Sequence, residues 1–512
     1  MILDRGLITR LLAQLDVGGP RFNVVVPFTN DVEFELPTAL ESDVDTAVAR
    51  VRDAQPAWAA LPVRERSRII LRFHDLVLRR REEILDIIQA ETGKARRDAM
   101  EEVLDVCINA RHYARDAARL LKPRRHRGAF PGAIGVNEYQ VPRGVVGVLA
   151  PWNYPLSLSA ADAIPALLAG NSVIIKPDAQ TSLTALWAVD LLREAGLPSD
   201  VVAVVPGEGP VVGPWVIDRV DYVMFTGSTR VGREVAARCG ERLVGCSLEL
   251  GGMNAMIVRA DVDPGRAAEI AVRACFANAG QLCISMERIY VHDRVYDAFA
   301  AAFAEATGRL TFATGIGWSG QMGSLSSERQ RDRVLSHIQD ATDRGATLLA
   351  GGRARPDLGP FIVEPTILTG VTEDMAACAE ETFGPVVALY RVADDADAIR
   401  LANDSPYGLN AAVVSRDRRA GRTVARALRA GSVNVNEGYG ASWGSVRAPM
   451  GGMGDSGLGR RHGDEGLLKY TESQTVAEQR LLGLGTPRGW TDERWSGVLA
   501  SAIGTMKRLG LK

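Results

Sequence analysis

Four short apolar segments in the first half of the chain constrain the fold most. They are rich in β-branched residues and lie at 145–149, 172–176, 201–205 and 222–225. Each segment is an unbroken apolar run, as in strands that are covered on both faces. Helical stretches such as 181–195 lie between them. This alternation predicts a doubly wound parallel sheet.

A second strand–helix section follows and extends to about residue 450. Its markers are two apolar runs at 255–258 and 288–291 and a helical pattern at 267–278. A chain of 512 residues is also long enough for at least two domains. We therefore expect a second α/β domain after the first.

Residues 123–143 differ from the sections on either side. Glycines and a proline lead into the run 136–141, which predicts a hairpin that protrudes or pairs with another subunit. Near the C-terminus, 495–509 has a helical pattern. For that helix we favour docking or oligomer packing over membrane anchoring.

Charge and cysteine usage exclude several classes of protein. The net charge of −2 creates no strong field, so neither nucleic acid nor an anionic membrane is an expected partner. The six cysteines form no Cys-x-x-Cys pair and the histidines are scattered, which favours reduced thiols and no metal site. No signal-peptide pattern is present, and prolines interrupt the uncharged run 144–161. We expect a cytoplasmic protein.

One cysteine and one carboxylate stand in glycine-bearing segments. Cys283 follows Gly280, and Glu249 precedes Gly251 and Gly252. A thiolate is a nucleophile and a carboxylate can activate water, so this pair predicts covalent chemistry followed by hydrolysis. Taken alone, a cysteine is more often a buried small apolar residue than a nucleophile, but the residues that flank Cys283 reverse this preference.

Three further segments have features of ligand sites. Gly227 and Ser228 follow a strand and open a helix, where free N–H groups suit an anion. Lys176 ends a strand, at the edge where open α/β sheets bind ligands. Asn153 stands in a loop stiffened by prolines, where its amide could stabilise an oxyanion. A strand-to-helix turn, a solvated lysine and a capped asparagine are the structural alternatives.

Together these segments resemble the aldehyde dehydrogenase superfamily, from Glu91-Thr92-Gly93-Lys94 to the glycine-rich motif at 451–457. The resemblance implies an α/β, aldehyde dehydrogenase-like fold with two doubly wound domains and a protruding β-hairpin oligomerisation element. The implied organisation is a dinucleotide-binding domain at 1–122 and 144–250, a catalytic domain at 251–455, an oligomerisation element at 123–143 and 473–490, and a helical tail at 491–512.

The resemblance also implies a role for each matching residue. Cys283 would attack the aldehyde, Asn153 would stabilise the oxyanion, and Glu249 would activate water to hydrolyse the thioester. The implied cofactor-binding residues are Pro151, Trp152, Lys176, Ala179, Gly209, Pro210, Gly227, Ser228, Glu381 and Phe383.

Two departures from the family pattern matter. Ala179 occupies a position where members that prefer NAD often carry a glutamate, which leaves room for a 2′-phosphate beside Lys176. We therefore expect NADP rather than NAD, although Asp178 keeps NAD open. Met253 and Ala255 stand where many members carry lysine and proline, so the loop after Glu249 could be rearranged.

Within the superfamily the chain is most similar to the actinobacterial succinate-semialdehyde dehydrogenase (NADP+) type. A carboxylate-bearing aldehyde favours an arginine in the pocket. Many members of that type place one just after the phenylalanine that matches Phe276, but here the position is Ala277. Tyr154, Arg447 and Met450 are the candidate pocket residues.

The best-matching activity is therefore NADP-dependent oxidation of succinic semialdehyde to succinate by a homodimer or homotetramer. Tyr154 and Met450 favour an alternative, which is oxidation of medium-chain aliphatic or aromatic aldehydes. A CoA-acylating dehydrogenase and a catalytically silent protein of the same fold are less favoured, because Cys283, Asn153 and Glu249 are all present.

Overall fold

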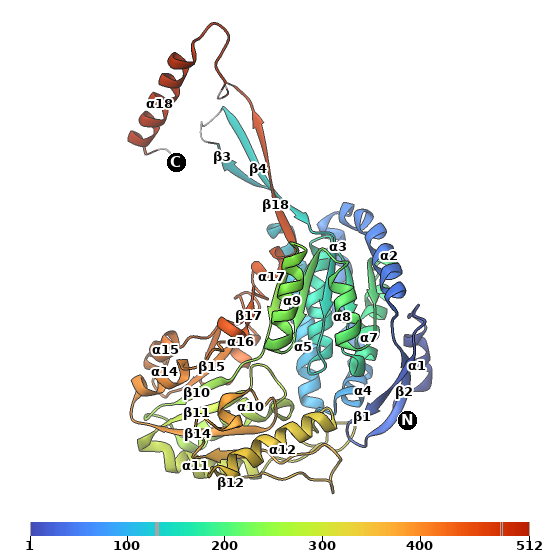
Figure 1. The fold of residues 1–512 in the computed structure, drawn as a ribbon, viewed down its shortest axis with the longest axis vertical. Coiled ribbons are helices and arrows are strands. Elements are labelled where there is room, and N and C mark those ends of the chain that lie inside the picture. The colour runs from blue at the N-terminus through green and yellow to red at the C-terminus, as the bar shows by residue number, and fades with distance from the viewer. Residues whose placement is uncertain (1, 129–132, 482, 484, 511–512) are drawn as a thin grey trace.

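The computed structural model describes residues 2–128, 133–481, 483 and 485–510. Within them the chain forms two mainly parallel sheets, helices that cover both faces of each sheet, and an arm that extends away from the body (Figure 1). The predicted fold class is confirmed. The predicted domain boundaries stay a prediction.

The first sheet is centred on β5 (Val145–Leu149) and β6 (Ser172–Lys176), which have the bounds expected from their unbroken apolar runs. Over the described residues its order is β17-β9-β8-β5-β6-β7, with every pair parallel except β17-β9. The remaining strands are β7 (Val202–Val204), β8 (Tyr222–Thr226), β9 (Gly245–Glu249) and β17 (Gly457–Leu458).

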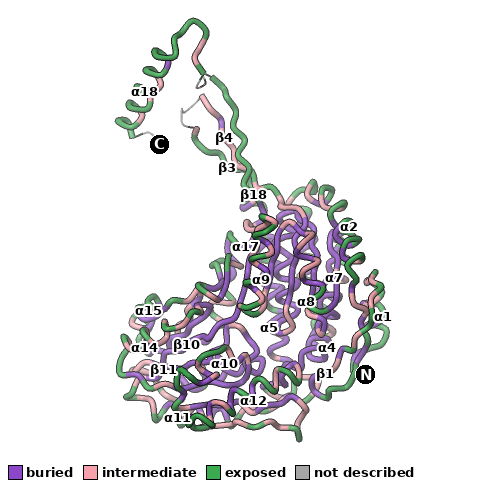
Figure 2. The backbone as a smooth tube through the Cα atoms, in the orientation of Figure 1, coloured by how far each residue is buried: buried purple, intermediate pink, exposed green. Residues whose placement is uncertain are grey.

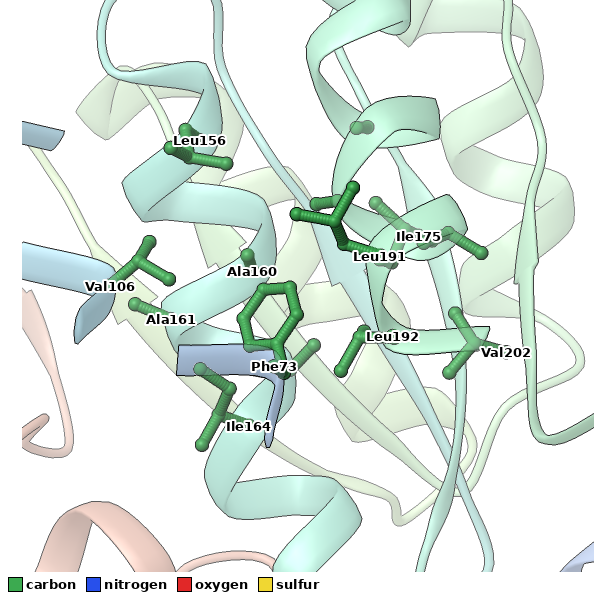
Figure 3. Packing of buried hydrophobic residues seen from close by; sticks show 14 of the residues in the cluster. Phe73, Val106, Leu156, Ala160, Ala161, Ile164, Ile175, Leu191, Leu192 and Val202 are labelled. Atoms are coloured by element: carbon green, nitrogen blue, oxygen red, sulfur yellow. The ribbon is translucent and has the colours of Figure 1, made fainter. Parts of the chain in front are cut away.

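Alternate residues of this sheet enter two apolar layers, because successive side chains of a strand point to opposite faces. Val146 and Val148 belong to a cluster built with helices α3 to α7, in which Phe73 packs near Leu192 (Figure 3). Val145 and Leu149 belong to a second cluster, built with α2, α8 and α9. The helices are α2 (Glu41–Ala60), α3 (Val63–Arg79), α4 (Arg81–Thr92), α5 (Arg96–Leu120), α6 (Asp162–Leu168), α7 (Ser182–Glu194), α8 (Gly209–Ile217) and α9 (Thr229–Glu241).

The second sheet has the order β12-β13-β14-β11-β10-β15-β16 over the described residues, and only the β12-β13 pair is antiparallel. Helices α10 to α13 cover one face, and α14 and α15 cover the other. The strands are β10 (Asn254–Val258), β11 (Met286–His292), β12 (Thr347–Ala350), β13 (Thr366–Thr369), β14 (Val386–Val392), β15 (Asn410–Val414) and β16 (Ser432–Val435). The helices are α10 (Pro264–Phe276), α11 (Asp293–Gly308), α12 (Glu328–Asp343), α13 (Ala376–Ala379), α14 (Asp395–Asn403) and α15 (Arg418–Ala427).

The C-terminal part of the chain returns to the first sheet. Strand β17 pairs antiparallel with the end of β9, where Gly457 lies opposite Glu249. No pattern in the sequence predicts this strand. Short elements flank it: α16 (Gly440–Trp443), η5 (Gly454–Ser456) and α17 (Glu465–Leu468).

The arm consists of β3 (Arg124–Arg127), β4 (Ile134–Pro142) and β18 (Thr471–Gln479), and α18 (Asp492–Arg508) follows it (Figure 1). Most of β18 and α18 is exposed (Figure 2). The hairpin and the tail helix are confirmed. Their role in oligomerisation stays a prediction, and the hairpin tip at 129–132 and the end of the tail at 511–512 lie outside the described residues.

Three elements at the N-terminus complete the body: α1 (Arg5–Leu12), β1 (Arg21–Val26) and β2 (Asp31–Pro37), of which β1 and β2 form an antiparallel pair. No helix in the described part of the chain combines the length and apolar character needed to cross a membrane.

Candidate active site

Cys283 lies in a loop that begins with a sharp backbone reversal. The predicted helix over 267–278 ends earlier, at Phe276, because Asn278, Ala279 and Gly280 have φ angles of 50°, 53° and 71°. These left-handed values are incompatible with a helix. A Cβ on Gly280 would lie 2.0 Å from a backbone oxygen, so only glycine fits there.

Hydrogen bonds fix this loop to its neighbours. Asn254 Nδ2 donates to the carbonyls of Cys283 at 2.8 Å and Ser285 at 2.7 Å. The Met253 carbonyl accepts from the Arg288 guanidinium. Ala255 lies within β10. The departures from the family pattern at Met253 and Ala255 therefore lie at the start of β10, where its pairing with β11 shifts register between Asn254 and Ala255.

Asn153 contacts the same loop from the other side. Its Nδ2 donates to the Gln281 carbonyl at 3.1 Å, two residues before Cys283, and the side chain is buried. A side-chain amide has two N–H donors, so a second one remains for a ligand oxygen. The Asn153 backbone carbonyl accepts from Lys94 Nζ at 2.6 Å and from Asn278 Nδ2 at 3.2 Å.

An ion pair with no solvent exposure fixes the Asn153 loop. Lys94 Nζ lies 2.6 Å from Glu102 Oε1, and both side chains are fully buried. The other carboxylate oxygen of Glu102 accepts from the backbone N–H groups of Leu156 and Ser157 at 2.8 and 3.2 Å. The Lys94 ammonium also lies 3.9 Å from the ring centre of Tyr154. This pair therefore connects the start of α5 to Asn153 and to the residues just after it.

Glu249 ends β9 and is buried. Its backbone is held between Thr226, its register partner on β8, and Gly457 on β17. Its Oε1 atom has no hydrogen-bond partner among the described residues. Burial raises the pKa of this carboxyl above its ordinary value, and Arg461 and Lys469 oppose the rise.

The surroundings of Cys283 also disfavour charge. Burial raises the pKa of its thiol to about 12, and Arg461 is the main group that lowers it. Glu249 and Glu381 act in the opposite direction. The segment after Glu249 passes close to the Cys283 loop at Gly252. A Cβ added to Gly252 would lie 3.3 Å from the Cys283 carbonyl oxygen. The structure thus brings together Cys283, Asn153 and the segment that follows Glu249.

The residues predicted to bind the adenosine end of a cofactor meet at the ends of β6 and β7. Lys176 is buried, and its Nζ would lie 3.8 Å from a Cβ on Gly209, which begins α8 with Pro210. Burial lowers the pKa of Lys176, whereas Asp178 and Glu208 oppose this change. Ala179 begins the short turn η2 (Ala179–Thr181), and the Asp178 carboxylate accepts from the Gln180 N–H at 3.0 Å.

Gly227 and Ser228 connect β8 to α9. The Ser228 hydroxyl caps α9 by accepting from the Val231 N–H. A Cβ on Gly227 would lie 2.5 Å from the Phe225 ring, so glycine lets the backbone pass close to it. Binding of an anion at this helix N-terminus stays a prediction.

Glu381 and Phe383 face the segment after Glu249. The Glu381 carboxylate accepts from the Gly252 N–H at 2.8 Å, and burial raises its pKa to about 7. Phe383 has a φ of 55° and its ring lies edge-on to Trp152, which follows Pro151, with 5.7 Å between centroids. The predicted cofactor residues from the two sheets therefore meet here.

The candidate substrate-pocket residues separate into two groups. Tyr154 and Met450 belong to the apolar cluster against which Cys283 packs, together with Leu158 and, at its edge, Trp443. Arg447 is not part of it: its side chain is 82% exposed and lies 3.7 Å from Asp116. The predicted pocket is therefore apolar near the thiol, with Arg447 at the surface.

Several residues that shape the site were not predicted to do so. Lys94 and Glu102 act through contacts with Asn153 and Leu156, which lie 59 and 54 positions away in the sequence. No local pattern indicates those contacts. Arg461 is the second of two arginines just after the glycine-rich motif at 451–457. That adjacency was the available signal, although such pairs usually lie on solvated loops.

Comparisons with known proteins agree on one family. The model of the aldehyde dehydrogenase family matches residues 16–476. A protein of Mycolicibacterium smegmatis is 51% identical over 94% of this chain and 93% of its own length. One of Mycobacterium tuberculosis is 48% identical over 99% of this chain and 98% of its own length. Both are provisionally named succinate-semialdehyde dehydrogenase, NADP(+).

Solved structures agree with the sequence matches. The NAD+ complex of an aldehyde dehydrogenase from Bacillus cereus has a TM-score of 0.86 and 34% identity, over 90% of this chain and 94% of its own. An NADP-dependent enzyme of Escherichia coli has a TM-score of 0.87 and 32% identity, over 91% of this chain and 96% of its own.

The buried pair at the Asn153 loop gives a stability prediction. Lys94→Met leaves the Glu102 charge buried without a partner, which should lower the free energy of unfolding in urea by about 3–5 kcal/mol. Lys94→Met combined with Glu102→Gln removes both charges and should regain most of that loss. The exposed pair of Arg68 and Glu65 is the control, and Arg68→Ala should cost below about 1 kcal/mol. A Lys94→Met variant as stable as the parent would contradict the role of the pair.

Proposed function

Since the chain belongs to the aldehyde dehydrogenase family and is an NAD(P)-dependent aldehyde dehydrogenase, we propose that it oxidises succinic semialdehyde to succinate with NADP, through a thioester on Cys283. The observation that carries the mechanism is the convergence of Asn153 and the Glu249–Gly252 segment on the Cys283 loop.

In the first step the Cys283 thiol loses its proton to solvent, and the resulting thiolate attacks the aldehyde carbon. The carbonyl oxygen becomes an oxyanion, and the Asn153 amide and the Cys283 backbone N–H donate to it. Because Lys94 and Glu102 hold the Asn153 loop, these donors need little rearrangement as charge develops. The nicotinamide cofactor, when bound, would supply the hydride acceptor for this step.

In the second step Glu249 takes a proton from the water that attacks the thioester. Its unpartnered Oε1 and its position at the end of β9 support this role. Dividing the oxidation into acylation and hydrolysis replaces one difficult step with two easier ones. Release of the acid returns Cys283 to its thiol form.

The residues present fit a dinucleotide. Gly227 and Ser228 provide a helix N-terminus for the pyrophosphate, and Lys176 provides a buried cation for the adenosine ribose or its phosphate. Glu381 offers a carboxylate to the nicotinamide ribose. Trp152 and Phe383 form an aromatic wall nearby, and Pro151 directly precedes Trp152.

The charges near Lys176 favour NADP over NAD. Ala179 adds no negative charge there, and the Asp178 carboxylate is already used to accept from the Gln180 N–H. A 2′-phosphate therefore meets a lysine and a small residue. The relatives from Mycolicibacterium and Mycobacterium are named for NADP(+), which is consistent with this assignment.

Succinic semialdehyde is proposed from the names of those relatives and from surface charge. Arg111, Arg115 and Arg447 line an open cavity of about 500 Å³ beside Gly444, which follows Trp443. The three arginines outnumber Asp116, which also lines this cavity, so its charge favours a carboxylate-bearing substrate. The apolar cluster of Tyr154, Leu158 and Met450 favours the second candidate, a medium-chain or aromatic aldehyde.

The remaining assignments follow the same reasoning. We propose a homodimer or homotetramer in which the β3-β4-β18 arm contacts a second copy, since its residues are largely exposed in a single chain (Figure 2). We also propose a cytoplasmic location, because reduced thiols suit a reactive cysteine.

A rate panel tests the substrate and the cofactor together. Succinic semialdehyde with NADP should give the highest kcat/KM among succinic semialdehyde, medium-chain aldehydes and aromatic aldehydes, each tested with NAD and NADP. A higher value for an apolar aldehyde would support the second candidate and overturn the first. Cys283→Ala is the control and should show no aldehyde-dependent NADPH formation.

Glu249→Gln separates the two steps. Without the base, acylation should still give a burst of NADPH of about one equivalent per active site, and the following steady-state rate should fall by roughly 10²–10⁴-fold. Stopped-flow absorbance measures both phases. Unchanged steady-state turnover would exclude Glu249 as the base.

Ala179→Glu tests the cofactor assignment. A carboxylate beside the 2′-phosphate should repel it, so the kcat/KM ratio of NADP to NAD should fall by about tenfold or more. Ala179→Gln has a similar size without the charge and should shift the ratio less. Equal shifts for both variants would attribute the effect to volume instead of charge.

A further inference from the structure

The C-terminal return of the chain brings an unpredicted arginine to the centre of the site. Arg461 follows β17, and its backbone N–H and carbonyl bond with Met450 at 2.7 Å each. Gly457 is paired with Glu249 on β9. The backbone that carries Arg461 is therefore fixed both to the strand that ends at Glu249 and to the apolar cluster beside Cys283.

Two polar groups aim the guanidinium. Arg461 Nη2 lies 2.8 Å from Asp162 Oδ2 and 3.2 Å from Thr226 Oγ1. Thr226 is the residue directly opposite Glu249 on the adjacent strand. The side chains of Arg461 and Asp162 are 18% and 7% exposed, so the pair is largely shielded from water. The cation thus lies beside the end of the strand that carries the proposed base.

Arg461 and Glu249 each carry one buried polar atom that has no partner among the described residues. The Arg461 Nε–H and the Glu249 Oε1 atom are each buried with no hydrogen-bond partner in the described part of the chain. A buried donor and a buried acceptor that are both unpaired are costly, and such groups are usually retained for a ligand or a reaction. One donor and one acceptor in the same site suit a small polar ligand such as the hydrolytic water.

The other charges that face Glu249 do not replace Arg461. Lys469 is a second cation, but its Nζ contacts Met224 Sδ at 3.3 Å, and burial lowers its pKa to about 8. Arg460 is directed away, since its guanidinium donates to the carbonyls of Gly452 and Gly459. Asp162 is the anion of the group and is already paired with Arg461.

The same guanidinium acts on both reactive acids. Arg461 is the largest lowering influence on the pKa of Glu249 and on that of Cys283. Burial reduces the tendency of Arg461 to carry charge, but Asp162, Glu249 and Cys283 raise its pKa above the ordinary value. It therefore stays protonated while either acid loses its proton.

We propose that Arg461 is a positioning residue for both steps, which stabilises the Cys283 thiolate during attack and holds ionised Glu249 and its water during hydrolysis. Asp162 and Thr226 fix the guanidinium in place for this task. The inference rests on the roles proposed above for Cys283 and Glu249. A merely structural ion pair is the alternative, and it predicts loss of stability without any change in pH dependence.

The first test measures the reactivity of the Cys283 thiol in the absence of turnover. Iodoacetamide modifies thiolates, and peptide mapping isolates the modification at Cys283. At about pH 8, below the thiol pKa, the rate is proportional to the thiolate fraction, so Arg461→Met should slow it by about tenfold or more. Arg461→Lys retains the charge and should recover much of the rate.

The second test measures the ionisation of Glu249 through the pH dependence of kcat. A neighbouring cation lowers the pKa of a carboxyl, so removing it raises that pKa, and Glu249 then stays protonated to a higher pH. The acid limb of the kcat profile should therefore move up by about one pH unit or more in Arg461→Met. The shift should be absent when the same change is made in the Glu249→Gln background.

Two controls separate this role from folding and from general charge. Arg461→Met combined with Asp162→Asn also removes the Asp162 charge that Arg461→Met alone leaves unpaired, and it should show the same slow alkylation with better stability. Arg460→Met changes the adjacent arginine and should cause a smaller effect in both tests. Equal effects at 460 and 461, or an unchanged alkylation rate in both Arg461→Met variants, would overturn the proposal. Retained turnover in Cys283→Ala would instead refute the proposed function, whereas the alkylation rate would still report on Arg461.

Discussion

The buried ion pair of Lys94 and Glu102 is the interaction on which the site depends. It joins the turn after α4 to the loop that carries Asn153, and the adjacent Gly93 carbonyl accepts from the Ser324 N–H at 2.9 Å. Asp98, in the first turn of α5, accepts from the Asn278 N–H in the Cys283 approach. Charges shielded from water cost free energy unless their geometry is excellent. Here that geometry fixes the Asn153 and Cys283 loops relative to each other.

The regular elements could be predicted where local composition decides the structure. Strands β5 and β6 match the predicted bounds, because both faces are covered and each run is apolar throughout. The helix predicted over 267–278 ends early because of contacts at long range. Asn278 donates to Asp98 and to the Asn153 carbonyl, and Gly280 lies against the Gly384 backbone. Strand β17 also depends on pairing at long range, and two residues carry too little pattern to indicate it.

The sequence indicates the individual residues of the candidate site, but not the charged groups that shift the pKa values of Cys283 and Glu249. Cys283, Asn153 and Glu249 stand in recognisable segments. The groups that set the protonation of Cys283 and Glu249, however, come from distant parts of the chain. Burial raises the pKa of both Cys283 and Glu249, and the opposing cation, Arg461, lies 178 positions beyond Cys283 in the printed sequence. Arg447 had the better local argument for binding an anion, but it lies at the surface.

The central claim is that the reaction passes through an acyl group on Cys283. Mass spectrometry of enzyme quenched during turnover tests it most directly, with the peptide that contains Cys283 isolated after digestion. The account predicts that this peptide gains the mass of the acyl group derived from the aldehyde, and that the gain needs the nicotinamide cofactor. An unmodified Cys283 throughout turnover, or an acyl group on another buried cysteine such as Cys275, would contradict it.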